Sequence, residues 1–479
     1  MSETSSARRG PPSYDLMVIG ERVVVGDGVV AAGIAIKGEQ VAALLDAEQA
    51  RRPGLATRTI DVGDKIVLPG VIDAHVHHRT LNDTADSWGS LTRGAALGGV
   101  TTVIPYIPHC PPMSLGETLE YFRDEGERES VIDFAMHCRL GGPTDDVFDQ
   151  IPEAFAVGVP SFKMFLAYRK RGIMWDGAPL MRALETIGGL GGIWCCHAEN
   201  GDLIDFLEDR YIAQGAYTAE TYLATRPHVA ELEAAFRAIQ LASALDCRLY
   251  LVHTSVADVL PIAAVARRAG KQVVVETCPQ YLTLTDETTR RNGGLAKIAP
   301  PMRYSEDNQA LWHGLVAGDV QVVASDHAPG PPDKKRYPPE RFGEISYGAP
   351  GTETLLPLLY SEGVARGRIS LPRLAEILSE APARVFGLYP RKGRIAPGAD
   401  ADLVVIDPTV RWRLDGSTLQ SEAGYSNWNG WELEGKPVLS LLRGRVLLDG
   451  EELRQGSGGG TYLPRFVDGA RESRQVVTS

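Results

Sequence analysis

Hydrophobic and polar positions follow three different patterns along the 479-residue chain. Between residues 14 and 66, short apolar runs are broken by turn residues at Gly26-Asp27-Gly28 and Lys37-Gly38, which predicts a small antiparallel β unit. From residue 67 to residue 389, short apolar runs alternate with longer segments of helical spacing. After Pro390 the strand pattern returns, in residues 398–408 and 436–453.

The middle segment predicts a barrel. Eight strands alternating with helices are typical of a (β/α)8 barrel of the TIM type, an α/β fold, although an open doubly wound sheet would show the same periodicity. The strand-like runs are GVIDAHVH (70–77), TTVIPY (101–106), IDFAMHC (132–138), SFKMFL (161–166), IWCCHAE (193–199), LYLVHTS (249–255), VVVETC (273–278) and VQVVASDH (320–327).

The two ends of the chain are expected to form one further domain. Residues 14–66 and 390–455 would pair as a small β-sandwich domain built from both ends, beside a catalytic barrel at 67–389. Residues 1–13 are polar and predict a flexible lead-in. Residues 456–479 begin with a glycine-rich run and predict a flexible C-terminal tail.

Composition narrows the class of protein. Lys and Arg number 49 against 61 Asp and Glu, a net charge of −12, which argues against a nucleic-acid binder. No apolar run approaches the roughly 20 residues that a membrane span needs, and the N-terminus has no hydrophobic signal core, so we expect a cytoplasmic protein without a membrane partner. The six cysteines show no C-x-x-C spacing and predict reduced, mostly buried thiols rather than a cysteine zinc site.

Histidines gather where the predicted barrel strands end. His75 and His77 lie two residues apart on the first strand, so both side chains point to the same side. Asp326 closes the eighth strand, next to the first once the barrel shuts, and adds a carboxylate to this pair. His197 ends the fifth strand and His253 the sixth, which gives a second imidazole pair. Two pairs at the end where barrel enzymes build their active sites predict two bound metal ions.

Lys163 is the candidate bridge between these ions. It lies on the fourth strand in the apolar run SFKMFL, between the two imidazole pairs. Burial disfavours the protonated ammonium, and a neutral amine can react with CO₂ to give a carbamate. The carbamate offers one oxygen to each ion, and its negative charge reduces their repulsion. The other six histidines do not fit this set, although His327 remains a candidate for the layer behind the ligands.

Several longer stretches resemble the amidohydrolase superfamily and, within it, the dihydropyrimidinase and D-hydantoinase group, over nearly the whole chain. They are LPGVIDAHVH, SFKMFLAY, HAENGDLI, ETCPQYLTL, SDHAP, LLYSEGVARGRISL, APARVFGLYPRKG and GADADLVVIDP. The resemblance implies a barrel with a composite β-sandwich, homotetramers or homodimers, and two Zn²⁺ ions bridged by N6-carboxylysine at Lys163, with Mn²⁺ or Co²⁺ as alternatives. All six implied metal ligands are present: His75, His77, Lys163, His197, His253 and Asp326.

The resemblance also assigns substrate contacts. Tyr168, five residues after Lys163, corresponds to a tyrosine that polarises the substrate carbonyl. Ala299 and Tyr347 stand where the group has other residues, at positions that hold the cyclic diamide through backbone groups. Arg79 follows the H-x-H pair at the spacing of dihydroorotases, whose arginine binds a substrate carboxylate; the competing interpretation is a salt-bridged residue at the mouth.

The predicted reaction opens the ring of a hydantoin or dihydropyrimidine to an N-carbamoyl amino acid. A hydroxide shared by the two metals would attack the carbonyl, and Asp326 would pass the proton to the departing nitrogen. One metal and the Tyr168 hydroxyl would stabilise the oxyanion. The partner is therefore a small cyclic ureide or imide.

Two kinds of alternative stay open. An allantoinase, a dihydroorotase-like enzyme or a cyclic imidase would use the same ligands. A non-catalytic scaffold related to dihydropyrimidinase belongs to another class of protein, but such relatives have lost metal ligands, and here the set is complete.

Overall fold

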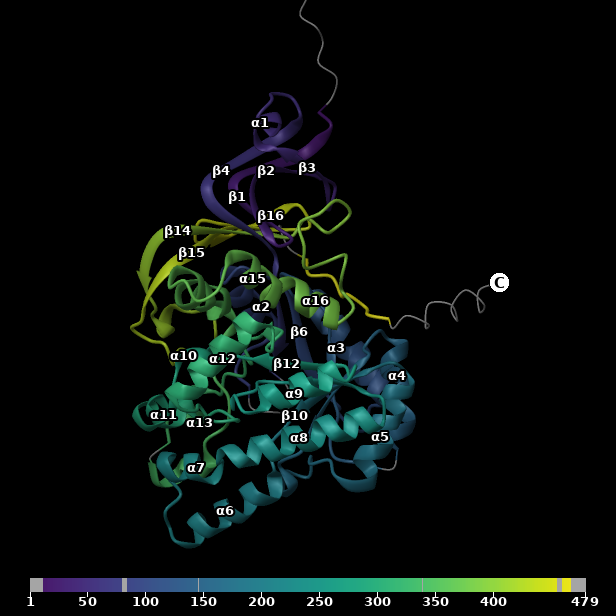
Figure 1. The fold of residues 1–479 in the computed structure, drawn as a ribbon, viewed down its shortest axis with the longest axis vertical. Helices are drawn as coiled ribbons and strands as arrows, with labels where there is room; N and C mark the ends of the chain where they lie inside the picture. Colours follow the sequence, from purple (N-terminus) through teal and green to yellow (C-terminus); the bar gives the residue numbers. More distant parts are fainter. Residues whose placement is uncertain (1–11, 80–83, 145, 338, 455–458, 467–479) are drawn as a thin grey trace, which may run out of the picture.

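The computed structural model describes residues 12–79, 84–144, 146–337, 339–454 and 459–466. The predicted lead-in at 1–13 lies almost entirely outside the described residues, as do 467–479 of the predicted tail. Two layers of structure dominate, a parallel barrel with its helices and a mixed β-sheet at one end of it (Figure 1).

The barrel prediction is confirmed, because each of the eight predicted runs supplies strand structure in parallel order. The barrel closes where Val76 pairs with His327 and the His77 amide donates to the His327 carbonyl at 2.7 Å. The strands, the third of which is split into β7 and β8, are β5 (Val71–Val76), β6 (Val100–Pro108), β7 (Asp133–Phe134), β8 (His137–Arg139), β9 (Ser161–Phe165), β10 (Ile193–His197), β11 (Arg248–Leu251), β12 (Val273–Thr277) and β13 (Val322–Val323).

Strand periodicity gives the barrel two apolar layers. On β10, Trp194 and Cys196 belong to the core between strands and helices, whereas Ile193 and Cys195 belong to the core inside the barrel. The interior is therefore filled by side chains, which leaves the ends of the strands as the place for a site. All six cysteines are free and buried, as predicted.

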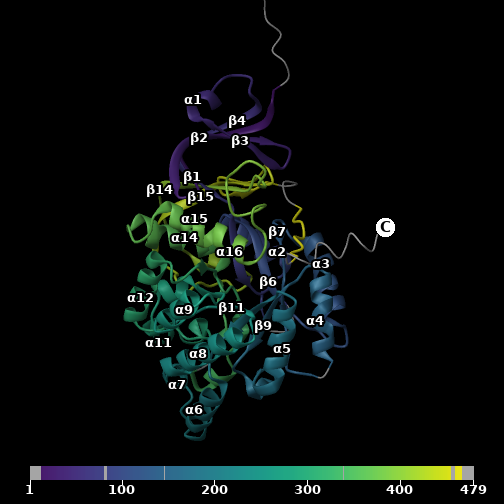
Figure 2. The ribbon, with the colours of Figure 1, turned by 45° about the vertical axis from the view of Figure 1, so that its right-hand side comes forward.

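Helices surround the barrel and follow the strands in chain order (Figures 1 and 2). In α3, Ser114 and Glu117 form a capping box at the N-terminus, and Leu115, Leu119 and Phe122 bury one face at helical spacing. The barrel helices are α2 (Trp88–Leu97), α3 (Leu115–Glu129), α4 (Val147–Ala156), α5 (Gly177–Gly189), α6 (Gly201–Ala213), α7 (Ala219–Thr225), α8 (His228–Ala244), α9 (Val259–Arg268), α10 (Pro279–Thr283), α11 (Asp286–Asn292), α12 (Ser305–Ala317), α13 (Pro332–Lys335), α14 (Leu355–Leu359), α15 (Leu371–Ala375) and α16 (Ala381–Val385). No helix in the described ranges combines the length and hydropathy needed to cross a bilayer.

The second sheet joins both ends of the chain, as predicted. It runs in the order β17-β16-β15-β14-β4-β1-β2-β3, and the antiparallel pair β4 and β14 connects the two segments. Purple N-terminal strands and yellow-green C-terminal strands meet at the top of Figure 1. The members are β1 (Tyr14–Val25), β2 (Gly28–Lys37), β3 (Gln40–Asp46), β4 (Ala56–Pro69), β14 (Leu403–Arg413), β15 (Glu432–Leu442), β16 (Arg445–Asp449) and β17 (Glu452–Leu453), with the short helix α1 (Ala47–Ala50) beside β2.

Two expectations about the chain ends need correction. The N-terminal unit is mixed rather than antiparallel, because β2, β3 and α1 return the chain so that β4 runs parallel to β1. Residues 459–466 do not behave as a flexible tail: the Leu463 amide donates to the Phe134 carbonyl, and the Arg465 side chain is buried against the barrel. Apolar residues after the glycine-rich run extend the core of the barrel. The composition of the C-terminal segment alone did not indicate this packing. The domain boundaries themselves stay predictions.

Candidate metal centre at the barrel mouth

The first predicted ligand group comes together at the carboxyl ends of β5 and β13. Nitrogen and oxygen atoms of His75, His77 and Asp326 all lie within 4.8 Å of one another. Asp326 Oδ1 is 3.1 Å from His75 Nε2 and 3.6 Å from His77 Nε2. The strand alternation that placed both imidazoles on one side was therefore a correct basis for the prediction.

The second group lies beside the first. His197 Nδ1 is 3.0 Å from His253 Nε2, and the Lys163 amine is 3.0 Å from His75 Nε2. The ring centroids of His75 and His253 are 5.4 Å apart, so the two imidazole pairs share one space. The structure thus brings all six predicted ligands together.

Lys163 lies in surroundings that disfavour its charge. Its side chain is buried, with the amine 4.6 Å from the centre of the Tyr106 ring. Burial lowers the pKa of Lys163 below its ordinary value, despite the opposing attraction of Asp326 and Glu276. A larger share of neutral amine is the property that the predicted carbamate requires.

Two carboxylates behind the histidines were not predicted. Glu276 Oε1 lies 2.7 Å from His75 Nδ1, and Glu199 Oε2 lies 2.9 Å from His197 Nε2. A carboxylate at one ring nitrogen holds the proton there and leaves the other nitrogen bare. In both rings the bare nitrogen then faces the shared space. The sequence contains the signal, since Glu276 interrupts the apolar strand VVVETC and Glu199 follows His197 by two residues.

The donor set fits divalent metal ions. Imidazole nitrogens and a carboxylate oxygen are ordinary ligands for zinc and similar ions. Burial lowers the pKa of His75 and of His253 well below the ordinary value, so both rings are neutral, as ligation requires. The buried Nδ1 of His253 has no hydrogen-bond partner among the described residues. Burial raises the pKa of Glu276 to about 8, and divalent ions bound beside His75 would favour its ionised form.

Three residues at the site have left-handed backbone conformations. The φ angles are 68° for Tyr168, 40° for His253 and 51° for Asp326. Such conformations are uncommon for residues other than glycine and persist where the surrounding structure enforces them. They aim these side chains after the strands have ended, which is why strand periodicity alone could not fix their directions.

A small cavity opens beside the ligands. It measures about 110 Å³. Gly348, with φ of 102°, forms part of its wall, and a Cβ there would lie 2.0 Å from the Ala328 carbonyl oxygen, so only glycine fits. The lining comprises His77, Lys163, Phe165, Tyr168, His197, His253, Ala299, Asp326, Ala328, Tyr347 and Gly348. The expected substrate contacts Tyr168, Ala299 and Tyr347 all line this cavity.

Arg79 does not. Its guanidinium donates to the Ala85 carbonyl at 2.6 Å and pairs with Glu422, and its side chain is 56% exposed. The salt-bridged interpretation therefore describes Arg79, and the carboxylate-binding role is not supported. The H-x-H-x-R spacing misled because the chain leaves β5 before Arg79 and turns its side chain toward the segment that follows β14.

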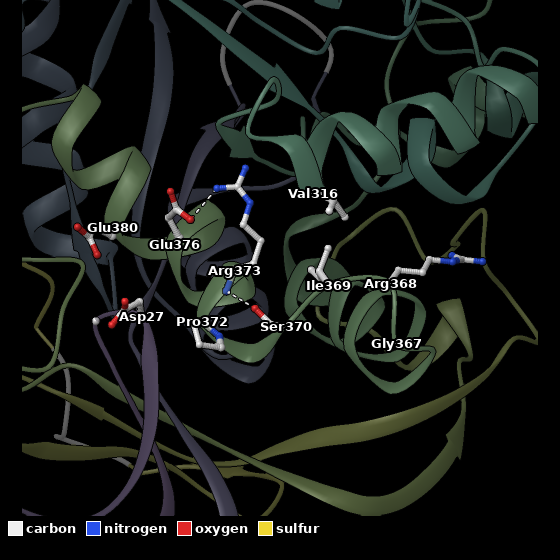
Figure 3. A pocket seen from close by; sticks show the side chains of 11 residues that line it. Asp27, Val316, Gly367, Arg368, Ile369, Ser370, Pro372, Arg373, Glu376 and Glu380 are labelled. Atoms are coloured by element: carbon white, nitrogen blue, oxygen red, sulfur yellow. Dashed lines mark hydrogen bonds and ion pairs between the residues drawn. The ribbon is translucent and has the colours of Figure 1, made fainter.

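A larger groove lies elsewhere and carries no comparable chemistry. It measures about 900 Å³, between the β1–β2 turn, the end of α12 and α15 (Figure 3). Two of its charged groups pair with each other, Arg373 with Glu376 at 2.7 Å, and Arg373 also donates to the Leu315 carbonyl. The site is defined by its ligand chemistry and not by the size of the opening.

Comparisons with known proteins agree with this geometry. A model of the Amidohydrolase family matches residues 216–447. A D-hydantoinase from Rhizobium radiobacter is 33% identical over 471 residues, covering 96% of this chain and 99% of the relative. An allantoinase from Rubrobacter xylanophilus is 36% identical over 465 residues, covering 96% and 100%. The crystal structure of dihydropyrimidinase from Brevibacillus agri superposes with a TM-score of 0.87 at 33% identity, covering 94% of this chain and 98% of that one.

The chain therefore belongs to the amidohydrolase family, whose members imply a binuclear metal centre of the kind that the clustered ligands could hold. Within that family it groups with the hydantoinases and dihydropyrimidinases.

Proposed function

We propose that this protein is a metal-dependent hydrolase of cyclic amides that opens a hydantoin or dihydropyrimidine ring to an N-carbamoyl amino acid. One observation carries the proposal: five of the six predicted ligand side chains line a cavity of about 110 Å³, and buried carboxylates lie behind His197 and behind the sixth, His75. That volume lies well below the roughly 300–1,000 Å³ of sites for drug-sized molecules. A small ring is the substrate that suits it.

The proposed cofactors are two Zn²⁺ ions per chain, with Mn²⁺ or Co²⁺ as alternatives. His75, His77, His197, His253 and Asp326 would hold them, together with Lys163 as N6-carboxylysine. When bound, such ions lower the pKa of water toward neutrality and polarise a carbonyl group. The buried Lys163 amine supports the modification, because its charged form is disfavoured there.

Asp326 is the proposed proton carrier. It would accept a proton from the attacking water as the oxygen joins the carbonyl carbon, and return that proton to the ring nitrogen as the carbon–nitrogen bond breaks. The facing His75 and His77 keep its pKa at about 2 despite burial, so the carboxylate is ionised and able to accept. The products are a carboxylic acid and a neutral nitrogen, which balances the single water consumed.

Tyr168 is the proposed oxyanion donor. Its side chain lines the cavity, with the ring centroid 5.1 Å from that of His197. Burial raises its pKa well above the ordinary value, so the hydroxyl stays protonated and can donate. One such preorganised donor contributes about 3 kcal/mol to transition-state stabilisation. Ala299 and Tyr347, which line the cavity, would offer backbone groups to the ring.

The test is a substrate panel on metal-replete protein, with metal content measured on the same sample. We expect about two metals per chain and ring opening of hydantoin or dihydrouracil. The 36% identity to an allantoinase makes allantoin the second candidate substrate. Dihydroorotate and succinimide complete the panel and test the dihydroorotase-like and imidase alternatives. A stably folded protein that binds no metal would instead support the alternative of a non-catalytic scaffold.

The proposed assembly is a homotetramer or homodimer. Light scattering of the purified chain would measure it directly, and a monomer at micromolar concentration would contradict it.

A further inference from the structure

Tyr347 forms a wall of the substrate cavity beside Tyr168. The centroids of the two rings are 6.1 Å apart, and Tyr168 in turn lies beside the ligand His197. Any ring that reaches the metal ligands therefore passes close to both tyrosines. What the wall does depends on whether the Tyr347 ring can move.

Arg226 fixes the Tyr347 ring from behind. This arginine follows α7, is only 1% exposed, and donates from Nη2 to the Tyr347 hydroxyl at 3.0 Å. Its guanidinium also lies 5.4 Å from the ring centre. The same arginine pairs with Glu208 at 3.4 Å and has its Nε 4.0 Å from Glu199, so it is itself held by carboxylates on two sides.

Two buried lysines fix the backbone that carries Tyr347. The Lys297 amine donates to the carbonyls of Phe342 and Ile345, both at 2.8 Å, and lies 4.7 Å from the centre of the Tyr347 ring. The Lys335 amine donates to the carbonyls of Ser346 and Gly348, at 2.9 and 2.8 Å. Buried carbonyls bound by a common donor cannot move apart without losing those bonds.

We infer that Tyr347 is a specificity-determining residue: a ring held rigid by Arg226, Lys297 and Lys335 that excludes substrates carrying a bulky group on the ring carbon. The inference rests on the proposed function and deepens it. A flexible side chain could rotate away from a substituent, whereas this ring has a hydrogen bond on its hydroxyl and lies against the Arg226 guanidinium and the Lys297 amine. The small cavity then selects unsubstituted or slightly substituted rings. Arg226 acts as a positioning residue, through Tyr347.

The experiment compares kcat/KM for unsubstituted hydantoin and for a hydantoin bearing a phenyl group. We expect the wild-type protein to prefer the unsubstituted ring. Tyr347→Ala should raise the phenyl-to-unsubstituted ratio about tenfold or more, the order of discrimination that an apolar wall provides. Tyr347→Phe keeps the ring and loses the hydroxyl, and Arg226→Lys keeps the charge with a shorter reach. Both should give ratios between those of the wild type and Tyr347→Ala.

Control variants test whether a change in substrate preference comes from the Tyr347 ring. Tyr121→Ala removes a tyrosine that is 53% exposed on α3 and should leave the ratio unchanged. Should Tyr347→Ala fail to fold, Tyr347→Leu removes the ring and keeps more of the volume. An active protein whose ratio falls or stays constant in the ring-deleted variant would overturn the wall, as would a Tyr347→Phe ratio as high as that of Tyr347→Ala. A wild type that opens no ring would refute the proposed function itself, and the wall with it.

Discussion

Two buried lysines, Lys163 and Lys392, stand in clusters that look alike in composition and differ in chemistry. Lys163 lies among imidazoles at the barrel mouth, with Asp326 and Glu276 as its acidic neighbours. Lys392 lies at the junction of barrel and sheet, where its amine contacts Asp133 and Asp402 at 2.6 Å and Asp400 at 2.9 Å. Oxygens of those three carboxylates lie within 4.8 Å of one another, the same spacing as in the His75 group.

The neighbours decide what each lysine can do. Burial opposes the charge on both, but the three carboxylates more than offset it at Lys392 and raise the pKa of that lysine, whereas the pKa of Lys163 falls. The ammonium of Lys392 fills the space where a cation would sit, so the acidic cluster is complete without a metal. At the barrel mouth the amine is available for chemistry. A count of potential ligands alone would not distinguish the two clusters.

Removing the Lys163 side chain should have the largest effect on metal content and activity. We expect Lys163→Ala to lose bound metal and to lower kcat/KM on the order of 10³-fold or more, since the proposed bridging ligand and its charge disappear together. Short carboxylic acids should restore part of the activity by occupying the vacated space. Elemental analysis and ring-opening rates measure both effects. Full activity in this variant would contradict the bridging role.

Removing Lys392 should affect stability and spare the metal centre. In Lys392→Met three buried carboxylates lose their cation, and breaking a buried ion pair in this way costs about 3–5 kcal/mol. Urea unfolding would measure the loss, with metal content expected to remain at the wild-type level. Lys436→Met is the matched control, because its partner Glu451 is 79% exposed and such surface pairs contribute about 0–1 kcal/mol. Equal losses in the two variants would remove the distinction between the clusters.

The sequence predicted which side chains come together because period-two strands carry them to a common edge. His75, His77 and His197 followed from their places on apolar runs, and Asp326 from the closure of the barrel. The pairing of the chain ends followed from the return of the strand pattern after Pro390. For the three histidines, the spacing along the strand determines the direction of the side chain.

Contacts between distant segments could not be predicted in the same way. Glu276 approaches His75 across 201 positions of sequence, and Arg226 reaches Tyr347 across 121. Arg79 matched a motif by spacing, but its partner Glu422 lies far along the chain. The parallel pairing of β1 and β4 likewise depends on how the intervening segment returns. These features depend on tertiary packing. The periodicity of a single sequence does not specify which distant segments pack together.

Glu276→Gln tests what the carboxylate behind His75 contributes to metal binding, because the variant removes the negative charge next to that imidazole. The amide oxygen can still accept from His75 Nδ1 and from the His253 backbone N–H, and the amide NH₂ can donate to the Tyr250 hydroxyl oxygen, so the fold should persist. Loss of the charge weakens the orientation and basicity of the imidazole, and such changes lower metal affinity about 10–100-fold. Competition with a chelator would report the affinity. Glu353→Gln, which changes a carboxylate bonded to the Gln420 amide away from the ligands, is the control and should leave metal affinity unchanged.

The smallest effect is expected at the edge of the Lys392 cluster, in Asp400→Asn. Asp400 shares its carboxylate between Lys392 and the half-exposed Arg391, each at 2.9 Å. Asp133 and Asp402 still compensate the ammonium, and the asparagine oxygen can keep both contacts as neutral hydrogen bonds, so the variant should be destabilised by only about 1 kcal/mol. Urea unfolding at neutral pH would measure this loss against that of Lys392→Met. If the ammonium is what organises the cluster, the aspartate variant must lose much less stability than the lysine variant. A loss in Asp400→Asn as large as in Lys392→Met would mean instead that the carboxylates, and not the lysine, hold the junction of barrel and sheet together.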